Sequence, residues 1–237
     1  MTRNPLALAS LALAFAFGGS ALAASAPLGA QNQGSGGAGH KSTDSDGTKK
    51  EKKDGSHDGK AVAKVGEKAP DFHFTDLDGK SHSLAEFSGK TVVLQWMHPG
   101  CPICRAKFEG GAVKKMMDEI HKVDADTVFI FVNSTRTEDG GSVDASRKYL
   151  ENNKIEGIAF WEGQGTVGRL YDAKTTPHLY VIDKKGVLAY AGAIDDDRSG
   201  KKGVNYVVEA VKALNEGRTP SPATTNAYGC TVKYAKN

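Results

Sequence analysis

One stretch decides the fold of this 237-residue chain: Thr91-Val92-Val93-Leu94-Gln95-Trp96-Met97-His98-Pro99-Gly100-Cys101-Pro102-Ile103-Cys104. The apolar, β-branched run over 91–96 predicts a strand covered on both faces, as in a parallel or mixed sheet. Pro99-Gly100 ends that strand, and a helix is expected from Pro102 onward. Cys101 then stands at the N-cap, with Pro102 at the first helical position, where its missing N–H costs nothing.

This position gives the cysteine pair its chemistry. Unpaired backbone N–H groups and the helix dipole stabilise an anion at a helix start, so Cys101 is expected to be a nucleophilic thiolate. Cys104 follows one turn later on the same face and can resolve a mixed disulfide at Cys101. The alternative is a structural or zinc-binding pair. A zinc site needs further ligands, and the chain holds only one more cysteine, Cys230.

The rest of the pattern alternates strands with helices. Further strands are expected at 127–132, 158–161 and 179–182, with a hairpin return at 187–191 and an N-terminal hairpin at 72–75 and 81–83. Helices are expected at 102–121, 145–152, 167–171 and 204–215. This order predicts one α/β domain around a central mixed sheet.

The N-terminal region is not expected to belong to that domain. Residues 1–23 have the basic start, short apolar run and small-residue cleavage pattern of a signal peptide. Residues 24–61 lack aromatic side chains and are rich in Gly, Ser, Lys and Asp, which predicts a disordered low-complexity linker. The folded domain is expected over 62–237, with a loop-like C-terminal tail. The protein is therefore predicted to be periplasmic or secreted, without a stable membrane anchor.

The charge and the motifs narrow the partners. The formal net charge is only +3 at pH 7, which gives no argument for binding nucleic acid. No cofactor is expected.

Thr176-Pro177 precedes the 179–182 strand, where a proline is tolerated at the strand start, in either a trans or a cis form.

Taken together, these motifs resemble the thioredoxin superfamily, and within it the exported redoxins of the alkyl hydroperoxide reductase/thiol-specific antioxidant (AhpC/TSA) type. The resembling segments are Val65 to Phe72, Leu84 to Lys90, the cysteine motif, Thr176-Pro177 and Asp183 to Gly186. The resemblance implies a thioredoxin-like three-layer α/β/α fold. It also implies that Pro177 is cis and packs against the Cys101 motif, and that the Thr176 backbone pairs with an incoming peptide or thiol substrate.

The resemblance leaves two enzymatic activities open. Thiol–disulfide exchange on protein or small-molecule substrates is favoured by the two-cysteine motif and by Pro177. A peroxiredoxin-like hydroperoxide reductase is the alternative, but its peroxide-activating hydroxyl and guanidinium are replaced here, the hydroxyl by His98. Thioredoxin-type reductases carry Trp directly before the first cysteine, whereas this chain has Gly100, and Trp96 stands five residues back. Trp96, His98 and Pro102 are expected to support the site.

Two further interpretations concern the remaining thiol and the histidines. Some resembling secreted redoxins keep a cysteine at the place of Cys230, which implies that Cys230 could resolve Cys101 or lock it. A surface thiol or a structural bridge is the alternative. A non-enzymatic copper or zinc delivery protein would use His98, Cys101, Cys104 and His178 as ligands.

Overall fold

The computed structural model describes residues 63–197 and 203–236. The predicted signal peptide (1–23) and linker (24–61) lie outside these residues. A five-stranded mixed sheet forms the centre, in the order β5-β4-β3-β7-β8. Its strands are β3 (Val92–Trp96), β4 (Val128–Asn133), β5 (Ile158–Trp161), β7 (His178–Ile182) and β8 (Leu188–Gly192). β3 runs parallel to β4, and β4 to β5, whereas β7 is antiparallel to both β3 and β8.

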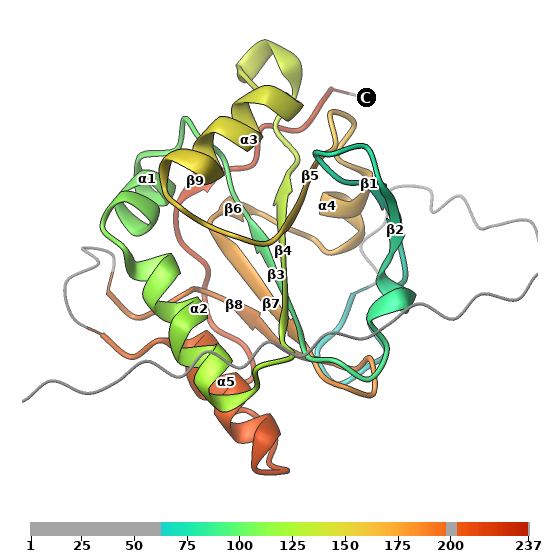
Figure 1. Cartoon of the computed structure of the whole chain (residues 1–237), viewed down its shortest axis with the longest axis vertical. Helices are drawn as coiled ribbons and strands as arrows, with labels where there is room; N and C mark the ends of the chain where they lie inside the picture. The colour runs from blue at the N-terminus through green and yellow to red at the C-terminus, as the bar shows by residue number, and fades with distance from the viewer. Residues whose placement is uncertain (1–62, 198–202, 237) are drawn as a thin grey trace, which may run out of the picture. The chain divides into compact units, whose positions relative to one another are not determined.

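Two apolar clusters cover the sheet, one on each face. Figure 1 shows the helices and the hairpin that lie over the sheet. The first packs under helices α1 (Pro102–Glu109), α2 (Ala112–Val123), α3 (Val143–Asn152) and α5 (Tyr206–Asn215). The second packs under the hairpin β1 (His73–Thr75) and β2 (Ser81–Ser83), the 3-10 turn η1 (Leu84–Phe87) and α4 (Thr166–Leu170). A second 3-10 turn, η2 (Thr137–Asp139), precedes α3. The predicted α/β fold with a central mixed sheet and covering layers on both faces is confirmed.

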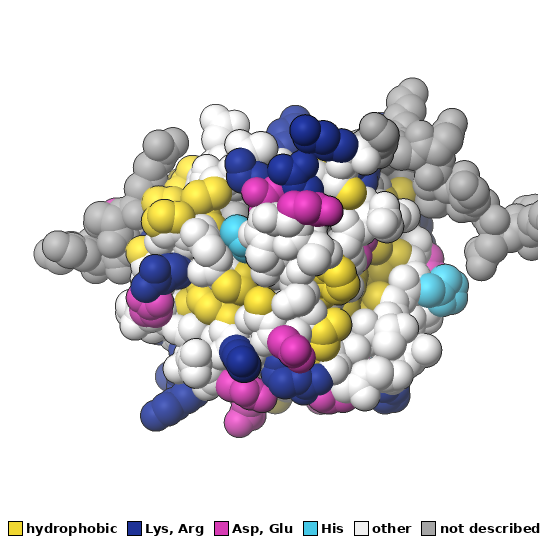
Figure 2. Space-filling view, turned by 90° about the horizontal axis from the view of Figure 1, so that it is seen from above, with side chains coloured by type: hydrophobic (Ala, Val, Ile, Leu, Met, Phe, Trp, Pro, Cys, Tyr) yellow, Lys and Arg dark blue, Asp and Glu magenta, His cyan; other side chains and the backbone are white. Residues whose placement is uncertain are grey.

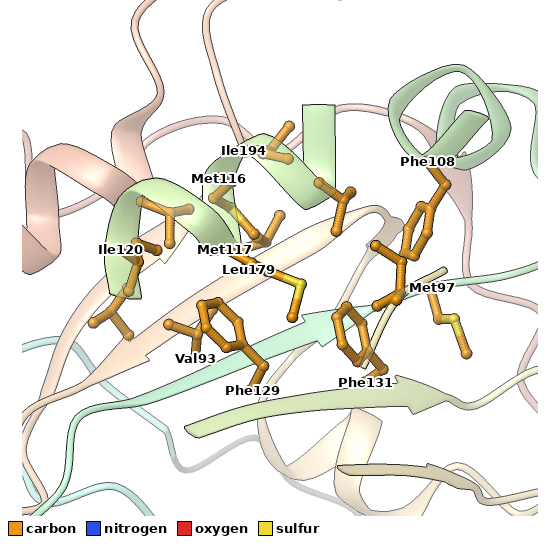
Figure 3. Close-up of a cluster of buried hydrophobic side chains, with 14 of the residues drawn as sticks. Val93, Met97, Phe108, Met116, Met117, Ile120, Phe129, Phe131, Leu179 and Ile194 are labelled. Carbon is orange, nitrogen blue, oxygen red and sulfur yellow. The ribbon is translucent and has the colours of Figure 1, made fainter. Parts of the chain in front are cut away.

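The alternation of β3 explains why its sequence is almost wholly apolar. Val93 and Met97 point into the first cluster, whereas Leu94 and Trp96 point into the second. Figure 3 shows the first cluster, with Phe108 and the α2 side chains above the sheet residues. Because each strand residue is buried on one face or the other, the period-2 polar pattern of a half-exposed strand is absent.

The predicted single helix over 102–121 is wrong, because the structure contains two helices there. α1 ends at Glu109, and Gly111 adopts a left-handed conformation with φ of 76° before α2 begins. Glycine reaches that conformation without the steric cost that a Cβ imposes. The apolar period continues across the break, which is why periodicity alone suggests one helix.

The expectation of a loop-like C-terminal tail is wrong for one short segment. Strand β9 (Cys230–Thr231) pairs antiparallel with β6 (Thr175–Thr176). Further along, the hydroxyl of Tyr234 donates to the carbonyl of Ala173 at 2.6 Å. The tail therefore lies against the segment that precedes Pro177. None of the helices within 63–197 and 203–236 has the length and apolar character needed to cross a membrane.

Candidate active site

The end of β3 and the start of α1 bring the two motif cysteines together. Cys101 is the N-cap of α1, with extended backbone angles of −80° and 119°, and Pro102 occupies the first turn. The backbone N–H of Cys104 points to Cys101 Sγ at 3.5 Å. This arrangement places an otherwise unpaired amide of the first helical turn on the sulfur, as expected for an anion at a helix N-terminus.

The Cys101 sulfur lies among groups from three parts of the chain. Its Sγ is 3.0 Å from the carbonyl oxygen of Thr176 and 2.8 Å from the Sγ of Cys230. The Thr176–Pro177 peptide bond is cis, as the resemblance implies. Cys101 is only 1% exposed and Cys104 is fully buried. All three cysteines are free thiols in this structure.

The three thiols have different pKa values, because their surroundings differ. The pKa of Cys101 is lowered from 9.0 to about 4, chiefly because the Cys104 side chain donates a hydrogen bond to its sulfur, with further donation from Cys230 and the Cys104 amide. Burial raises the pKa of Cys104 well above its usual value, and the Cys101 thiolate raises it further. The pKa of Cys230 is also raised, by burial first and then by Cys101. Cys101 is therefore the ionised thiol at neutral pH.

This division predicts an unusual titration for Cys101. The thiolate ultraviolet absorbance of the reduced wild type, minus that of Cys101→Ser, should rise near pH 4, whereas an ordinary thiol ionises near pH ~8.5. Because the folded pKa lies below the unfolded one, ionisation stabilises the reduced fold fully above the unfolded pKa, and this contribution is lost as the pH falls towards 4. A difference signal confined to pH values above ~8 would contradict the assignment.

The other predicted site residues occupy different places. Trp96 packs in the cluster on the opposite face of the sheet from Cys101, and its Nε1 donates to Ser134 Oγ at 2.9 Å. The prediction that Trp96 supports the site is therefore corrected to a role in the core. His98 is half-buried, and its carbonyl accepts from the Cys101 amide at 3.0 Å. Pro102 is exposed at the start of α1.

The proposed metal ligands do not assemble into a centre. His178 lies beside Tyr180, whose hydroxyl is 3.0 Å from His178 Nδ1, and burial lowers the pKa of His178 to about 4. Within the described ranges, no group of three or more His, Cys, Asp and Glu side chains is arranged to hold a metal ion. The predicted ligand set of His98, Cys101, Cys104 and His178 is therefore not arranged as a metal site.

A buried ion pair near the site was missed at the level of sequence. Lys107 on α1 is completely buried, and its Nζ lies 2.6 Å from Asp195 Oδ2. The hydroxyl of Tyr228 donates to the same carboxylate and lies 3.0 Å from the carbonyl oxygen of Asp197. Tyr228 stands two residues before Cys230, so the pair ties α1 to the tail. The one sequence feature that could have indicated this pair is a lysine on the apolar side of α1, next to Phe108.

Fold and site together define a thioredoxin-like protein with a cysteine at a helix start. A hypothetical protein from Sinorhizobium meliloti 1021 has the same fold, with a TM-score of 0.65 and 20% identity, covering 74% of this chain and 97% of that one. An uncharacterised conserved protein from Geobacillus kaustophilus gives a TM-score of 0.65 and 24% identity, covering 74% and 95%.

The sequence comparisons name the family. The model described as Redoxin matches residues 64–208, which is more than half of the chain. The chain therefore belongs to the redoxin family, as its motifs suggested. A curated relative, the thioredoxin-like protein YneN of Bacillus subtilis, is 27% identical over 124 residues, which are 52% of this chain and 68% of that protein.

Proposed function

We propose that this protein is a thiol–disulfide oxidoreductase in which Cys101 attacks and Cys104 resolves. The observation that carries the proposal is the Cys101 sulfur at the N-terminus of α1, held beside the Thr176 carbonyl with its pKa lowered to about 4. A thiolate at neutral pH is the nucleophile that disulfide exchange requires. Cys104 keeps its proton until the first step is complete, because its pKa is raised.

The two steps balance within the protein and one substrate disulfide. The Cys101 thiolate attacks one substrate sulfur, forms a mixed disulfide and releases the other substrate sulfur as a thiolate. Cys104 then loses its proton and attacks Cys101 Sγ, which forms the Cys101–Cys104 disulfide and releases the second substrate thiol. The substrate gains two electrons and the protein loses two, so an external dithiol must restore the enzyme for further turnover.

The substrate class follows from the backbone beside the thiolate. Thr176 lies in β6, a short strand outside the main sheet, whose backbone can pair with an extended segment. Figure 2 shows the end of the molecule where α3 and the C-terminus lie, and separate hydrophobic patches there lie among acidic and basic groups. A surface of this mixed character suits a polypeptide partner. Proteins with exposed disulfides are therefore the proposed substrates, and small disulfides would serve as poorer ones.

The test is insulin reduction by the full chain with dithiothreitol as the terminal reductant. The expected result is precipitation of the insulin B chain faster than with dithiothreitol alone. A correctly folded protein that gives only the uncatalysed rate would overturn the proposal.

A hydroperoxide reductase is less well supported by the site. That activity needs donors that stabilise the peroxide oxygen beside the thiolate. The groups that lower the Cys101 pKa are its neighbouring thiols, the Cys104 amide and Thr176. Arg105, the nearest arginine in sequence, pairs with Glu109 on an exposed face. Peroxide consumption coupled to a thiol reductant would separate the two activities.

The cellular location is proposed from the N-terminal sequence. The basic, apolar and small-residue pattern over 1–23 is typical of an export signal, so we assign the active protein to an extracytoplasmic compartment.

A further inference from the structure

The proposed nucleophile is covered by its own chain. Cys101 is 1% exposed, and the sulfur of Cys230 lies 2.8 Å from its own sulfur. Cys230 comes from the C-terminal segment, 129 residues further along the chain. A protein disulfide cannot reach a thiolate in this state, so the segment that covers it must move before any exchange with a protein substrate.

The covering segment binds in the manner of an added strand. β9 pairs antiparallel with β6, with Thr176 opposite Cys230 and Thr175 opposite Thr231. The Val232 amide donates to the Lys174 carbonyl at 3.1 Å. The segment thus pairs with the backbone edge next to Pro177, which is the edge proposed above to bind a substrate polypeptide. It also places a cysteine against the nucleophile.

The fit of this segment depends on close backbone approach. Gly229 has φ of 144°, and a Cβ at this position would lie 2.1 Å from the Thr176 carbonyl oxygen. No side chain other than glycine's fits there without displacing the strand. On the preceding side, Tyr228 is held by the buried Asp195 carboxylate, which Lys107 of α1 also contacts. The segment is therefore anchored to the helix that carries the nucleophile.

We infer that residues 229–232 form a tethered pseudosubstrate: a strand that occupies the site of the partner polypeptide and presents Cys230 as the partner's cysteine. This inference rests on the proposed function. It specifies the partner as an extended segment that contains a cysteine, aligns antiparallel to β6 and carries a small residue directly before that cysteine. It also means that a substrate competes with the tail for Cys101.

The covalent consequence is an internal disulfide exchange. Starting from the oxidised Cys101–Cys104 form, Cys230 loses its proton and attacks Cys101 Sγ. The Cys101–Cys230 bond forms, the Cys101–Cys104 bond breaks, and Cys104 leaves as a thiolate that takes up the proton. No net electrons are transferred. The second form protects the nucleophile while the tail stays paired, and a reducing thiol reopens it.

The first test maps disulfides in the full-length Cys104→Ser variant, oxidised with a small disulfide, oxidised glutathione. Cys101 attacks the glutathione disulfide and releases one glutathione, and Cys230 then displaces the second. Peptide mass spectrometry without reduction should find an intramolecular Cys101–Cys230 bond in most molecules. A persistent Cys101–glutathione adduct, or a disulfide-linked dimer, would overturn the inference.

The second test removes the strand without touching a sulfur. Gly229→Ala should displace the tail and raise the rate at which maleimide labels Cys101 in the reduced full chain, by about tenfold or more, because the open fraction rises. Gly217→Ala is the matched control, since Gly217 also has positive φ, at 73°, but a Cβ there would contact nothing within 4 Å. Equal labelling of Cys101 in Gly229→Ala and in the wild type would also overturn the inference.

Neither readout depends on turnover, so the two proposals fail separately. A chain that forms the Cys101–Cys230 bond and opens in Gly229→Ala, yet reduces no insulin, would retain the tethered strand and lose the oxidoreductase assignment. Near-ultraviolet circular dichroism of each variant shows whether its core remains folded.

Discussion

Cys101→Ser should lower the rate of insulin reduction by about 1000-fold or more, because a serine hydroxyl is not ionised at neutral pH and cannot take part in disulfide exchange. This is the largest effect expected for any single substitution in the chain. The thiolate at Cys101 is what the start of α1 and the Cys104 hydrogen bond stabilise. The rate is measured as insulin precipitation with excess dithiothreitol, at equal concentrations of folded protein.

The same chemical change at Cys104 should give a different defect. Cys104→Ser keeps the attacking thiolate but removes the resolving sulfur. Combined with Cys230→Ser, which removes the other sulfur that could displace the substrate, it should accumulate a mixed disulfide between Cys101 and the substrate on a non-reducing gel. In Cys101→Ser no such adduct should form. If Cys101→Ser retained a tenth of the wild-type rate, or if the two variants behaved alike, the assignment of attack to Cys101 would be wrong.

Lys107→Met should destabilise the fold by about 3–5 kcal/mol, which is the usual cost of leaving one partner of a buried ion pair alone. Lys107 is completely buried, and Asp195 is 8% exposed. Methionine fills much of the lysine stem but leaves the carboxylate without its cation. Tyr228 and the Asp197 amide still donate to that carboxylate, which favours the lower end of the range.

The measurement is chemical denaturation in urea, comparing midpoints at equal m-value. Lys212→Met is the matched control, because Lys212 forms an ion pair with Glu209 on an exposed face of α5, and such pairs contribute about 0–1 kcal/mol. A Lys107→Met protein as stable as the control would show that the buried pair does not hold α1 and the tail in place. The variant should also label faster at Cys101, because the Asp195 carboxylate that holds Tyr228 loses its own contact with α1.

The strands of the sheet were the most predictable part of the structure. β3 and β4 were expected within one residue at each end, because β-branched apolar runs bounded by turns are a local signal. The helix start after β3 was equally predictable from local sequence, since a cysteine followed by proline is typical of a helix start. The two-glycine break between α1 and α2 was missed, because the apolar period continues through it.

The residues that complete the site come from distant segments. Nothing in the local pattern around Tyr228 shows that its hydroxyl reaches Asp195, or that Lys107 is buried beside it. Trp96 shows the opposite error. Because it is close to Cys101 in sequence, it was predicted to support the site, but its side chain points into the cluster on the other face of the sheet. In a strand, successive side chains point to opposite faces, so small shifts in sequence decide which core a residue joins.

The sequence by itself determined an α/β redoxin with a cysteine at a helix start, because strand, turn and helix-cap signals are all encoded within a few residues. Only the tertiary structure decided that Cys230 lies against that nucleophile and that β9 fills the strand position beside Pro177. Two segments more than 50 residues apart meet there through the backbone pairing of β6 and β9. Such bonds carry no side-chain signature, and therefore leave no pattern in the sequence.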